Sequence, residues 1–381
     1  MQDTDPTPAV SQASALAAWL RLEQTPGVGP ITAGILLARF KSPHAIFAAS
    51  HAALRAVVSD ALASALLAVP DAAQARALDT ILSWCSLDGN HVLTLDDPAY
   101  PALLREIPDP PLLLYAKGQP ALLAGPALAI VGSRNATTQG KHTAAAFAEA
   151  LSSAGLTIVS GLALGIDTAA HEGALRGPGS TIAVVGTGAD RIYPRRNRAL
   201  AHQIAQDGCV LSEYPLGTAA LAANFPRRNR LISGLACGVL VVEAAAGSGS
   251  LITANVANEQ GRDVFAIPGS IHSPLSKGCH KLIQNGARLV ETAADLFEAL
   301  AMAPLVTGAL PHAGQAGAAA AAVDGDSAAL LEVMGQGPLH GDILADLSDM
   351  PPGKLLAQLM ALELAGMVER LPGGLFQRLN R

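Results

Sequence analysis

The chain has 381 residues, of which half are hydrophobic, 15% are charged and 3% are aromatic. This length favours two or three domains, and the composition excludes a globally disordered chain. The formal net charge of −6 argues against a nucleic-acid-binding protein, but residues 126–295 hold 14 Lys and Arg against 11 Asp and Glu, whereas the rest of the chain holds 11 against 20. The excess of cations therefore lies in the middle of the chain.

The sequence contains no stretch that resembles a membrane span. Its most apolar run, residues 235–246, is twelve residues long and carries Glu243, whereas a spanning helix needs roughly 20 apolar residues. Residues 1–10 lack the basic and apolar regions of a signal peptide, so we expect a cytoplasmic protein. The four cysteines are far apart in the sequence, which predicts neither disulfides nor a zinc site.

The first predicted domain, residues 11–82, is rich in alanine and leucine at helical spacing, which predicts a small helical domain. Residues 26–30, with the sequence PGVGP, separate two helical patterns and resemble the turn of a helix-hairpin-helix, whose backbone amides bind a DNA phosphate. Few cations lie nearby, so an ordinary turn between helices is the alternative that the sequence favours.

The second predicted domain, residues 83–302, alternates short runs rich in Val and Ile with helical patterns such as residues 141–154 and 251–260. This alternation predicts an α/β fold with an extended Rossmann-like, doubly wound, mostly parallel sheet, whose ligands bind at the carboxyl ends of the strands. The predicted strands are Ala127–Val131, Thr157–Ser160, Thr181–Val185, Cys209–Ser212, Gly238–Val242, Asp263–Ile267 and Arg288–Val290.

The last part of the chain begins with residues 303–326, which are alanine, glycine and proline with almost no charge and predict a linker. Residues 327–381 then show three helical patterns, at 328–334, 341–347 and 354–365. Two strand-like runs follow, Val368–Leu371 and Leu375–Leu379, joined by Gly373 and Gly374. This order predicts a winged helix domain.

Glycine-rich turns follow several of the predicted strands. The first places Gly132, Ser133 and Arg134 after residues 127–131, and the second begins at Ser160 and Gly161. Glycine lets the backbone approach a phosphate, serine and early helix amides donate hydrogen bonds, and arginine offers a planar fork to phosphate oxygens. Each turn alone is weakly specific. Two further turns are Gly186–Asp190, followed by Tyr193, Pro194 and Asn197, and Gly247–Ser250.

The run Asn224–Gly234 is more specific. Arg227, Arg228 and Arg230 surround Asn229 at a predicted helix start, where the helix dipole disfavours cations. We therefore expect these arginines to bind an external anion. Phe225 comes directly before Pro226, which holds the backbone extended, and we expect its ring to stack on a base rather than to pack in the core.

Taken in order, these turns resemble the DprA family, also called Smf, the DNA-processing proteins of natural transformation. The resemblance spans residues 93–291, including the lead-in LTLDDPAYPALLREIPDPPLLLYAKG, and is carried by eight ordered motifs. They are VGSR, SGLALGIDTAAH, GTGADRIYPRRN, SEYPLG, FPRRNRLISGL, VVEAAAGSGSLITA, GRDVFAIPGS and KGCHKLIQNGA.

The resemblance implies a recombination mediator that binds and protects single-stranded DNA and helps to load RecA, usually as a homodimer. It also implies a SAM-like domain before the sheet and a winged helix after it. His280 stands where the family pattern leads us to expect asparagine, which leaves the role of its loop open. The DNA contacts predicted from the resemblance and the turns are Gly132, Ser133, Arg134, Ser160, Gly161, Phe225, Arg227, Arg228, Asn229 and Arg230.

The sequence contains no phosphate loop, no uninterrupted dinucleotide fingerprint after a strand, no HExxH and no nucleophile elbow. We therefore expect no catalytic residue, no cofactor and no metal. His142, His171 and His280 are expected to have structural roles in helices or loops. One alternative is a nucleotide phosphoribohydrolase-like enzyme, in which the Glu243 carboxylate would bind a ribose. Another is a transcription regulator, but Lys354 is the only cation on its reading helix.

Overall fold

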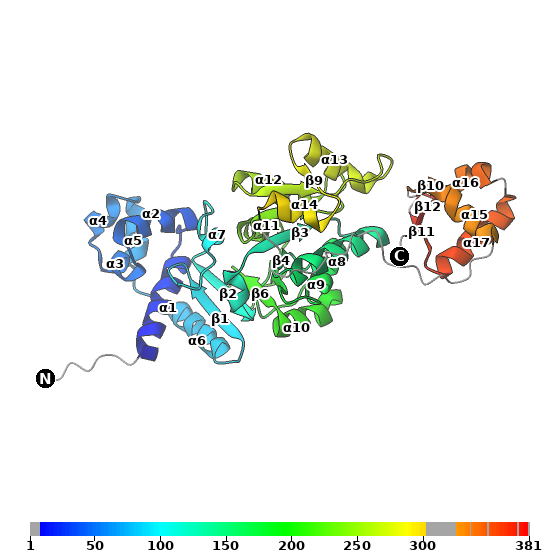
Figure 1. Ribbon diagram of the computed structural model, residues 1–381. Helices are drawn as coiled ribbons and strands as arrows, with labels where there is room; N and C mark the ends of the chain where they lie inside the picture. The colour runs from blue at the N-terminus through cyan, green and yellow to red at the C-terminus, as the bar shows by residue number, and fades with distance from the viewer. Residues whose placement is uncertain (1–7, 302–324, 336, 349, 372, 380–381) are drawn as a thin grey trace. The chain divides into compact units, whose positions relative to one another are not determined.

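The computed structural model describes residues 8–301, 325–335, 337–348, 350–371 and 373–379 (Figure 1). Contacts divide the chain into two compact units, Met1–Gly125 with Ile182–Leu235, and Pro126–Thr181 with Ala236–Arg381. The domain boundaries expected after residues 82 and 302 stay predictions. The expected linker spans residues 303–326, and its residues 303–324 lie outside the described residues.

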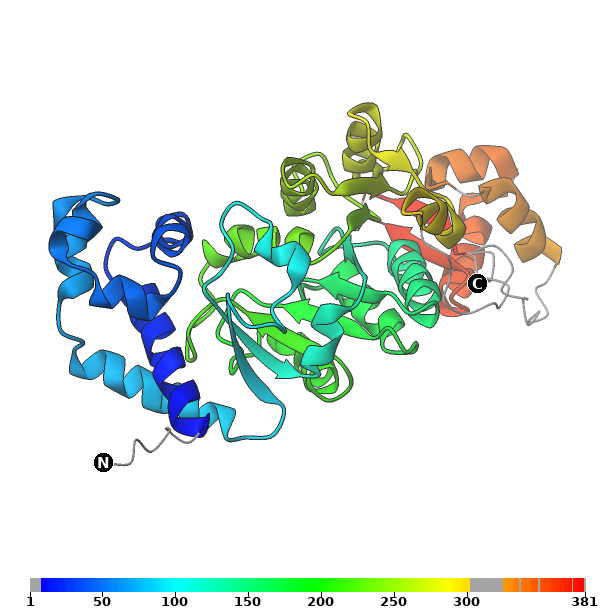
Figure 2. The same cartoon turned by 60° about the vertical axis from the view of Figure 1, so that its left-hand side comes forward.

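The first unit begins with six helices, which confirms the helical pattern of residues 11–82. Figure 2 shows them as the blue part of the chain, followed by the cyan strands. Ser42, Ser50 and Ser59 each accept a backbone amide at a helix start, and Asp71 with Gln74 forms a capping box. The helices are α1 (Pro8–Gln24), α2 (Pro30–Phe40), α3 (Pro43–Ala48), α4 (His51–Arg55), α5 (Asp60–Leu67) and α6 (Ala72–Cys85).

A nine-stranded sheet, ordered β1-β2-β6-β5-β4-β3-β7-β8-β9, follows these helices. Its strands are β1 (Asn90–Thr94), β2 (Leu113–Gly118), β3 (Ala127–Val131), β4 (Thr157–Ser160), β5 (Thr181–Val184), β6 (Cys209–Ser212), β7 (Gly238–Val241), β8 (Asp263–Ala266) and β9 (Arg288–Leu289). In the first unit β5 and β6 pair in parallel, and β2 pairs antiparallel with both β1 and β6. The seven strands predicted from the sequence are all present, whereas the antiparallel β1 and β2 are not among the predictions.

The first unit also holds the helices between these strands. They are α7 (Ala102–Arg105), η1 (Pro120–Ala124), η2 (Arg195–Asn197), α10 (Arg198–Asp207) and α11 (Asn224–Gly234). One hydrophobic core joins the helices of residues 8–85 to β2, because Trp84 packs edge-on against the fully buried Tyr115 at 6.2 Å between ring centroids. The N-terminal helices and the edge of the sheet are therefore packed as one body.

In the second unit, β3 pairs in parallel with β4 on one side and with β7 on the other. Strands β8 and β9 continue in parallel from β7. The chain therefore leaves β3 in one direction and returns to its other side, which is the strand order of a doubly wound sheet and confirms the predicted α/β fold. The helices are α8 (Thr138–Ser153), α9 (Ile166–Ala174), α12 (Gly249–Glu259), η3 (Pro274–Ser276), α13 (Lys277–Gln284) and α14 (Ala293–Ala299).

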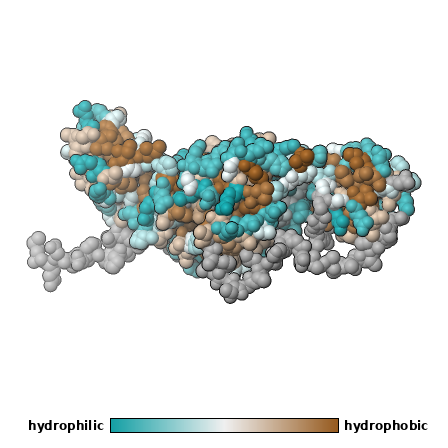
Figure 3. Space-filling model, turned by 45° about the horizontal axis from the view of Figure 1, so that its top comes forward, coloured by the Kyte–Doolittle hydropathy of each residue, from teal (hydrophilic) through white to brown (hydrophobic). Residues whose placement is uncertain are grey.

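The C-terminal residues form three helices and a small sheet ordered β10-β12-β11, the architecture expected of a winged helix. Gly373 and Gly374 have φ of 84° and 76°, a turn conformation that favours glycine. Apolar patches are visible on this domain in Figure 3. The elements are α15 (Gly325–Met334), β10 (Leu339–His340), α16 (Gly341–Ser348), α17 (Pro352–Leu364), β11 (Val368–Leu371) and β12 (Leu375–Arg378). Among the described residues, no helix is both long and apolar enough to cross a membrane.

Candidate nucleic-acid interface

The loop after β3 carries the first predicted motif. A Cβ added at Gly132 would lie 2.5 Å from Ile166 Cγ1 and 2.9 Å from the carbonyl oxygen of Glu243, so glycine is required here by packing inside the chain. Ser133 is buried; its amide donates to the Glu243 carbonyl at 2.7 Å, and its hydroxyl accepts the amide two residues further on. Arg134 follows with an exposed side chain. Of the three motif residues, Arg134 is the one that presents its side chain to solvent.

The turn after β4 uses its polar groups within the chain. The buried Ser160 hydroxyl donates to the Ile130 carbonyl at 2.6 Å. The amides of Gly161 and Ala163 donate to Oδ2 of Asp167 at 3.1 and 3.3 Å. A carboxylate of the same turn therefore already accepts these two amides, whereas anion binding by the first amides of α9 stays a prediction. Contacts of Ser160 and Gly161 with DNA stay a prediction.

His171 lies fully buried behind this turn, and its neighbours determine its tautomer. The Thr181 hydroxyl donates its one proton to the Ile158 carbonyl at 2.6 Å, so it accepts at 2.7 Å from Nδ1 of His171. Nε2 then accepts the amide of Leu162 at 3.3 Å. This arrangement describes a neutral, structural histidine rather than an acid or base that faces a substrate.

Glu243, the residue singled out for a ribose in the enzyme alternative, is half-buried against the start of α8. Its two carboxylate oxygens accept the Thr137 amide at 2.9 Å and the Thr137 hydroxyl at 2.6 Å. Burial raises the pKa of Glu243, and the Thr137 hydrogen bonds act in the opposite direction. A Cβ at Gly140 would lie 2.3 Å from the Glu243 carboxyl carbon, so the carboxylate occupies a tight space. These contacts assign Glu243 to anchoring the helix.

In the first unit, Phe225 is the second residue of α11 and is only partly buried. The Asn224 side chain donates to the Gly186 carbonyl at 3.0 Å, and the Tyr214 hydroxyl donates to the Asn224 carbonyl at 3.1 Å. Burial, then the charge of Glu213, raises the pKa of Tyr214 to about 12. A Cβ at Gly186 would lie 3.1 Å from the Phe225 ring, so the small residue leaves room for it.

The three arginines of α11 do not share one environment. Arg227 is exposed, with 57% of its side chain accessible. Arg228 is buried and donates to the Val184 carbonyl. Arg230 is buried, donates to Glu213 and places Nε 2.9 Å from Oδ2 of Asp109.

The premise that these cations lack an internal partner is therefore wrong for Arg228 and Arg230, because folding brings a carbonyl and two carboxylates to them. Direct DNA contact by these two residues, and by the half-buried Asn229, stays a prediction. Arg227 is the arginine of this run whose side chain reaches solvent, and it follows the partly exposed ring of Phe225. We call Phe225 and Arg227 together the α11 surface.

The sequence argument gave no role to the arginines around Tyr193. Residues 191–198, RIYPRRNR, contain four arginines, all with exposed side chains. The Tyr193 ring lies 5.4 Å from the Phe225 ring, centroid to centroid, so the loop adjoins the α11 surface within the first unit. The density of arginine in this short run was the signal available in the sequence.

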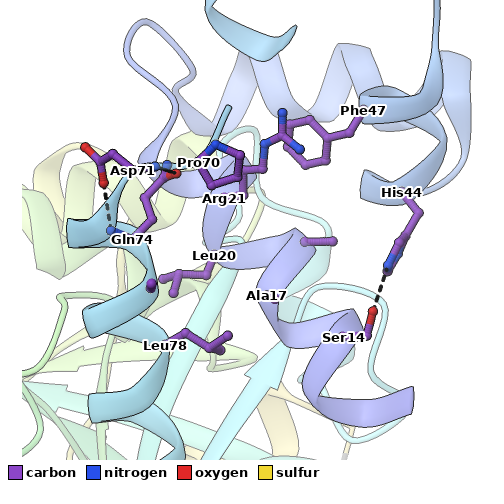
Figure 4. Close-up of a pocket in the computed structure, with 12 residues that line it drawn as sticks. Ser14, Ala17, Leu20, Arg21, His44, Phe47, Pro70, Asp71, Gln74 and Leu78 are labelled. Atoms are coloured by element: carbon purple, nitrogen blue, oxygen red, sulfur yellow. Dashed lines mark hydrogen bonds between the residues drawn. The ribbon is translucent and has the colours of Figure 1, made fainter. Parts of the chain in front are cut away.

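A pocket of about 370 Å³ lies among the N-terminal helices (Figure 4). Its lining residues are far in sequence from the predicted DNA contacts. Its lining is largely apolar, and its main polar groups already have partners. Arg21 lies over the Phe47 ring at 3.8 Å and donates to the carbonyls of Leu66 and Ala68, and Asp71 caps α6. The pocket therefore offers little to a charged ligand.

His280 and Cys279 are the remaining residues of interest for metal or acid–base chemistry. Among the described residues, no group of three or more His, Cys, Asp or Glu could hold a metal ion. Nε2 of His280 lies 2.9 Å from the carbonyl oxygen of Gly269, which ties α13 to the loop before it. Burial raises the pKa of the Cys279 thiol to about 11, so this side chain is a neutral thiol in the core.

Two family models match parts of the chain. Residues 91–301 match the model of DNA recombination-mediator protein A, and residues 314–374 match that of the DprA winged helix domain. The chain is 41% identical over 307 residues to protein Smf of Escherichia coli, which covers 80% of this chain and 82% of the relative. It is 53% identical over 201 residues to DNA processing protein DprA of Streptococcus pneumoniae, which covers 53% and 71%.

Two solved structures share the fold. The X-ray structure of DNA processing protein A from Streptococcus pneumoniae matches with a TM-score of 0.64 and 39% identity, covering 74% of this chain and 97% of that one. DNA processing protein A from Helicobacter pylori, a structure described for its single-stranded DNA binding mode, matches with a TM-score of 0.51 and 32% identity. That match covers 55% of this chain and 96% of the other.

Proposed function

Because the chain belongs to the DNA recombination-mediator protein A family, we propose that it is a recombination mediator that binds single-stranded DNA and leaves its covalent bonds intact. The observation that carries the proposal is the α11 surface, where a partly exposed aromatic ring and an exposed guanidinium adjoin at a helix start. An aromatic ring can stack on an unpaired base, and a guanidinium can bind a phosphate.

The residues divide into contacts and support. Arg227 in the first unit and Arg134 in the second bind phosphates, and Phe225 stacks on a base. In the second unit, the loops that support Arg134 contain Gly132, Ser133, Ser160 and Gly161. In the first unit, Asn229 supports the α11 surface. Arg228 and Arg230 support the site indirectly. Their hydrogen bonds within the chain fix the start of α11 in the orientation that exposes Phe225.

The family resemblance extends the proposal to partners. The chain protects incoming single-stranded DNA during natural transformation, helps to load RecA onto it, and acts as a homodimer in the cytoplasm. Single-strand preference has a physical reason in this scheme, since bases in a duplex are stacked on each other and do not reach an aromatic side chain.

The test compares single- and double-stranded oligonucleotides of equal length by fluorescence anisotropy over a series of salt concentrations. We expect tighter binding of the single strand and an affinity that falls as salt rises, by about 0.7 in the slope of the logarithms for each phosphate bound. Arg134→Ala weakens binding and reduces this slope, whereas Phe225→Ala weakens binding at a similar slope. Arg176→Ala, which removes an exposed arginine paired with Glu149, is the matched control and changes neither.

An unchanged affinity of Arg134→Ala at moderate salt contradicts the assignment of this loop to phosphate binding. The same protein preparation is assayed for release of base from nucleoside monophosphates. The phosphoribohydrolase alternative is not favoured, because the Glu243 carboxylate that it requires is held by Thr137. Base release at a rate proportional to protein concentration overturns the proposed function.

A further inference from the structure

The loop of residues 191–198 combines one exposed aromatic side chain with four exposed arginines. Tyr193 is 49% accessible, whereas the other three tyrosines of the chain, Tyr100, Tyr115 and Tyr214, are at most 8% accessible. Within the described residues, the Tyr193 hydroxyl has no hydrogen-bond partner. The ring packs against Phe225, but hydrogen bonding within the described residues does not account for the hydroxyl of Tyr193.

Ion pairs within the described residues also do not account for the arginines of this loop. Nε of Arg191 lies 3.8 Å from Oδ2 of its neighbour Asp190. No carboxylate of the described residues lies within the 4.0 Å ion-pair distance of Arg195, Arg196 or Arg198. Arg195 and Arg196 lie in η2, and Arg198 is the first residue of α10, where the helix dipole disfavours cations. Their environment is the opposite of that of the paired Arg230.

The position of Tyr193 links this loop to the α11 surface. Its ring lies 5.4 Å from that of Phe225, at an angle of 41° between the ring planes. Tyr193 and Phe225 both belong to the first unit. Gly186, which lies in the loop that leads to Tyr193, is next to the Phe225 ring. The two rings therefore adjoin in the first unit, and the exposed Arg195, Arg196 and Arg198 follow Tyr193 closely in the chain.

We propose that residues 191–198 are a second contact for single-stranded nucleic acid, in which Tyr193 stacks on the base next to the one on Phe225 and Arg195, Arg196 and Arg198 bind the phosphates that follow. This inference rests on the proposed function and extends its site by one base and the adjoining phosphates. The ligand it requires is a polyanion with accessible base faces, which a duplex does not offer. The tilt between the rings means that the two bases are splayed rather than stacked on each other.

The test uses the full chain, a fluorescent oligothymidine and a salt series. Tyr193→Leu lowers the affinity by roughly 5- to 150-fold at an unchanged salt slope, the range that stacking of one base supplies. Tyr193→Phe keeps the affinity within about 3-fold, because it keeps the ring. The double variant Arg195→Ala, Arg196→Ala reduces the salt slope by about 1.4, for two phosphates. Arg55→Ala with Arg76→Ala removes the same charge from exposed positions of the N-terminal helices and leaves the slope unchanged.

A second measurement is independent of the effect of substitutions on folding. An oligonucleotide with 5-bromodeoxyuridine, irradiated in complex with the unaltered protein, crosslinks to the peptide that contains Tyr193. Wild-type binding with no crosslink in this peptide and no change in the variants overturns this inference and leaves the proposed function standing. Failure of the wild-type protein to bind the oligothymidine in dilute buffer overturns the proposed function itself.

Discussion

Replacement of Arg230 by alanine separates a structural arginine from a DNA-binding one. The Arg230 side chain is 10% exposed, and it pairs with Glu213 and with Asp109 at 2.9 Å. Removing one partner of a buried ion pair leaves the other charge without compensation, at a cost of about 3–5 kcal/mol. Arg227 is the matched comparison, since its exposed Nε lies 3.9 Å from Oε1 of the same Glu213. A pair of that kind contributes under about 1 kcal/mol.

The assay is urea unfolding followed by tryptophan fluorescence, because both tryptophans, Trp19 and Trp84, lie in the same unit as Arg230. With a urea dependence of roughly 3 kcal/mol per molar, Arg230→Ala lowers the midpoint by about 1 M or more. Arg227→Ala leaves the midpoint within about 0.3 M and instead weakens single-stranded DNA binding. Affinity is measured at a temperature at which both variants are folded.

The pH dependence gives a second readout of the same pair. Burial raises the pKa of Glu213, and Arg230 is the main influence that lowers it. Loss of Arg230 raises the folded-state pKa of Glu213 further above its unfolded value. Stability of the variant is then lost as pH rises, so its deficit is largest near pH 8 and shrinks on acidification. An unchanged urea midpoint combined with a loss of affinity, or a deficit that grows on acidification, refutes the assignment of Arg230 to the core.

Three further predictions concern stability. Burial, then the charge of Glu213, raises the pKa of Glu23 to about 7, so the free energy of unfolding falls as pH rises from about 4.5 to 7. Glu23→Gln removes this pH dependence and stabilises the protein by up to about 3 kcal/mol at pH 8. A variant that is less stable than the wild type at pH 8 contradicts this prediction. Gly165 has a φ of 83°, and Gly165→Ala puts a Cβ 2.2 Å from the Ser133 carbonyl oxygen. We expect the free energy of unfolding in urea to fall by at least about 2 kcal/mol. An unchanged urea midpoint speaks against the close approach of these two loops. His171→Leu removes the acceptor of the Leu162 amide and the donor to the Thr181 hydroxyl, so we expect a loss of about 2 kcal/mol by the same assay. A neutral effect rules out a stabilising role of the hydrogen bonds through this ring.

The sequence alone determined most elements of the fold. Short, mainly apolar runs such as Ala127–Val131 and Cys209–Ser212 form strands with the predicted bounds, because strands buried on both faces are mainly apolar. The motif order also determined the family. Strands β1 and β2 were not predicted. The residues of β1, NHVLT, mix polar and apolar side chains, and their place in a sheet depends on pairing with β2.

What only the tertiary structure decided is which polar groups of the motifs face solvent. Arg227 and Arg230 look equivalent in the sequence, but Glu213 and Asp109, the partners of Arg230, come from distant segments that the sheet and α7 region bring to it. Likewise, Asp167 takes the amides of Gly161 and Ala163 only once the turn has closed. A local pattern records that a cation or an amide is present. Whether it has a partner within the chain depends on contacts between residues far apart in sequence, and these exist only in the folded protein.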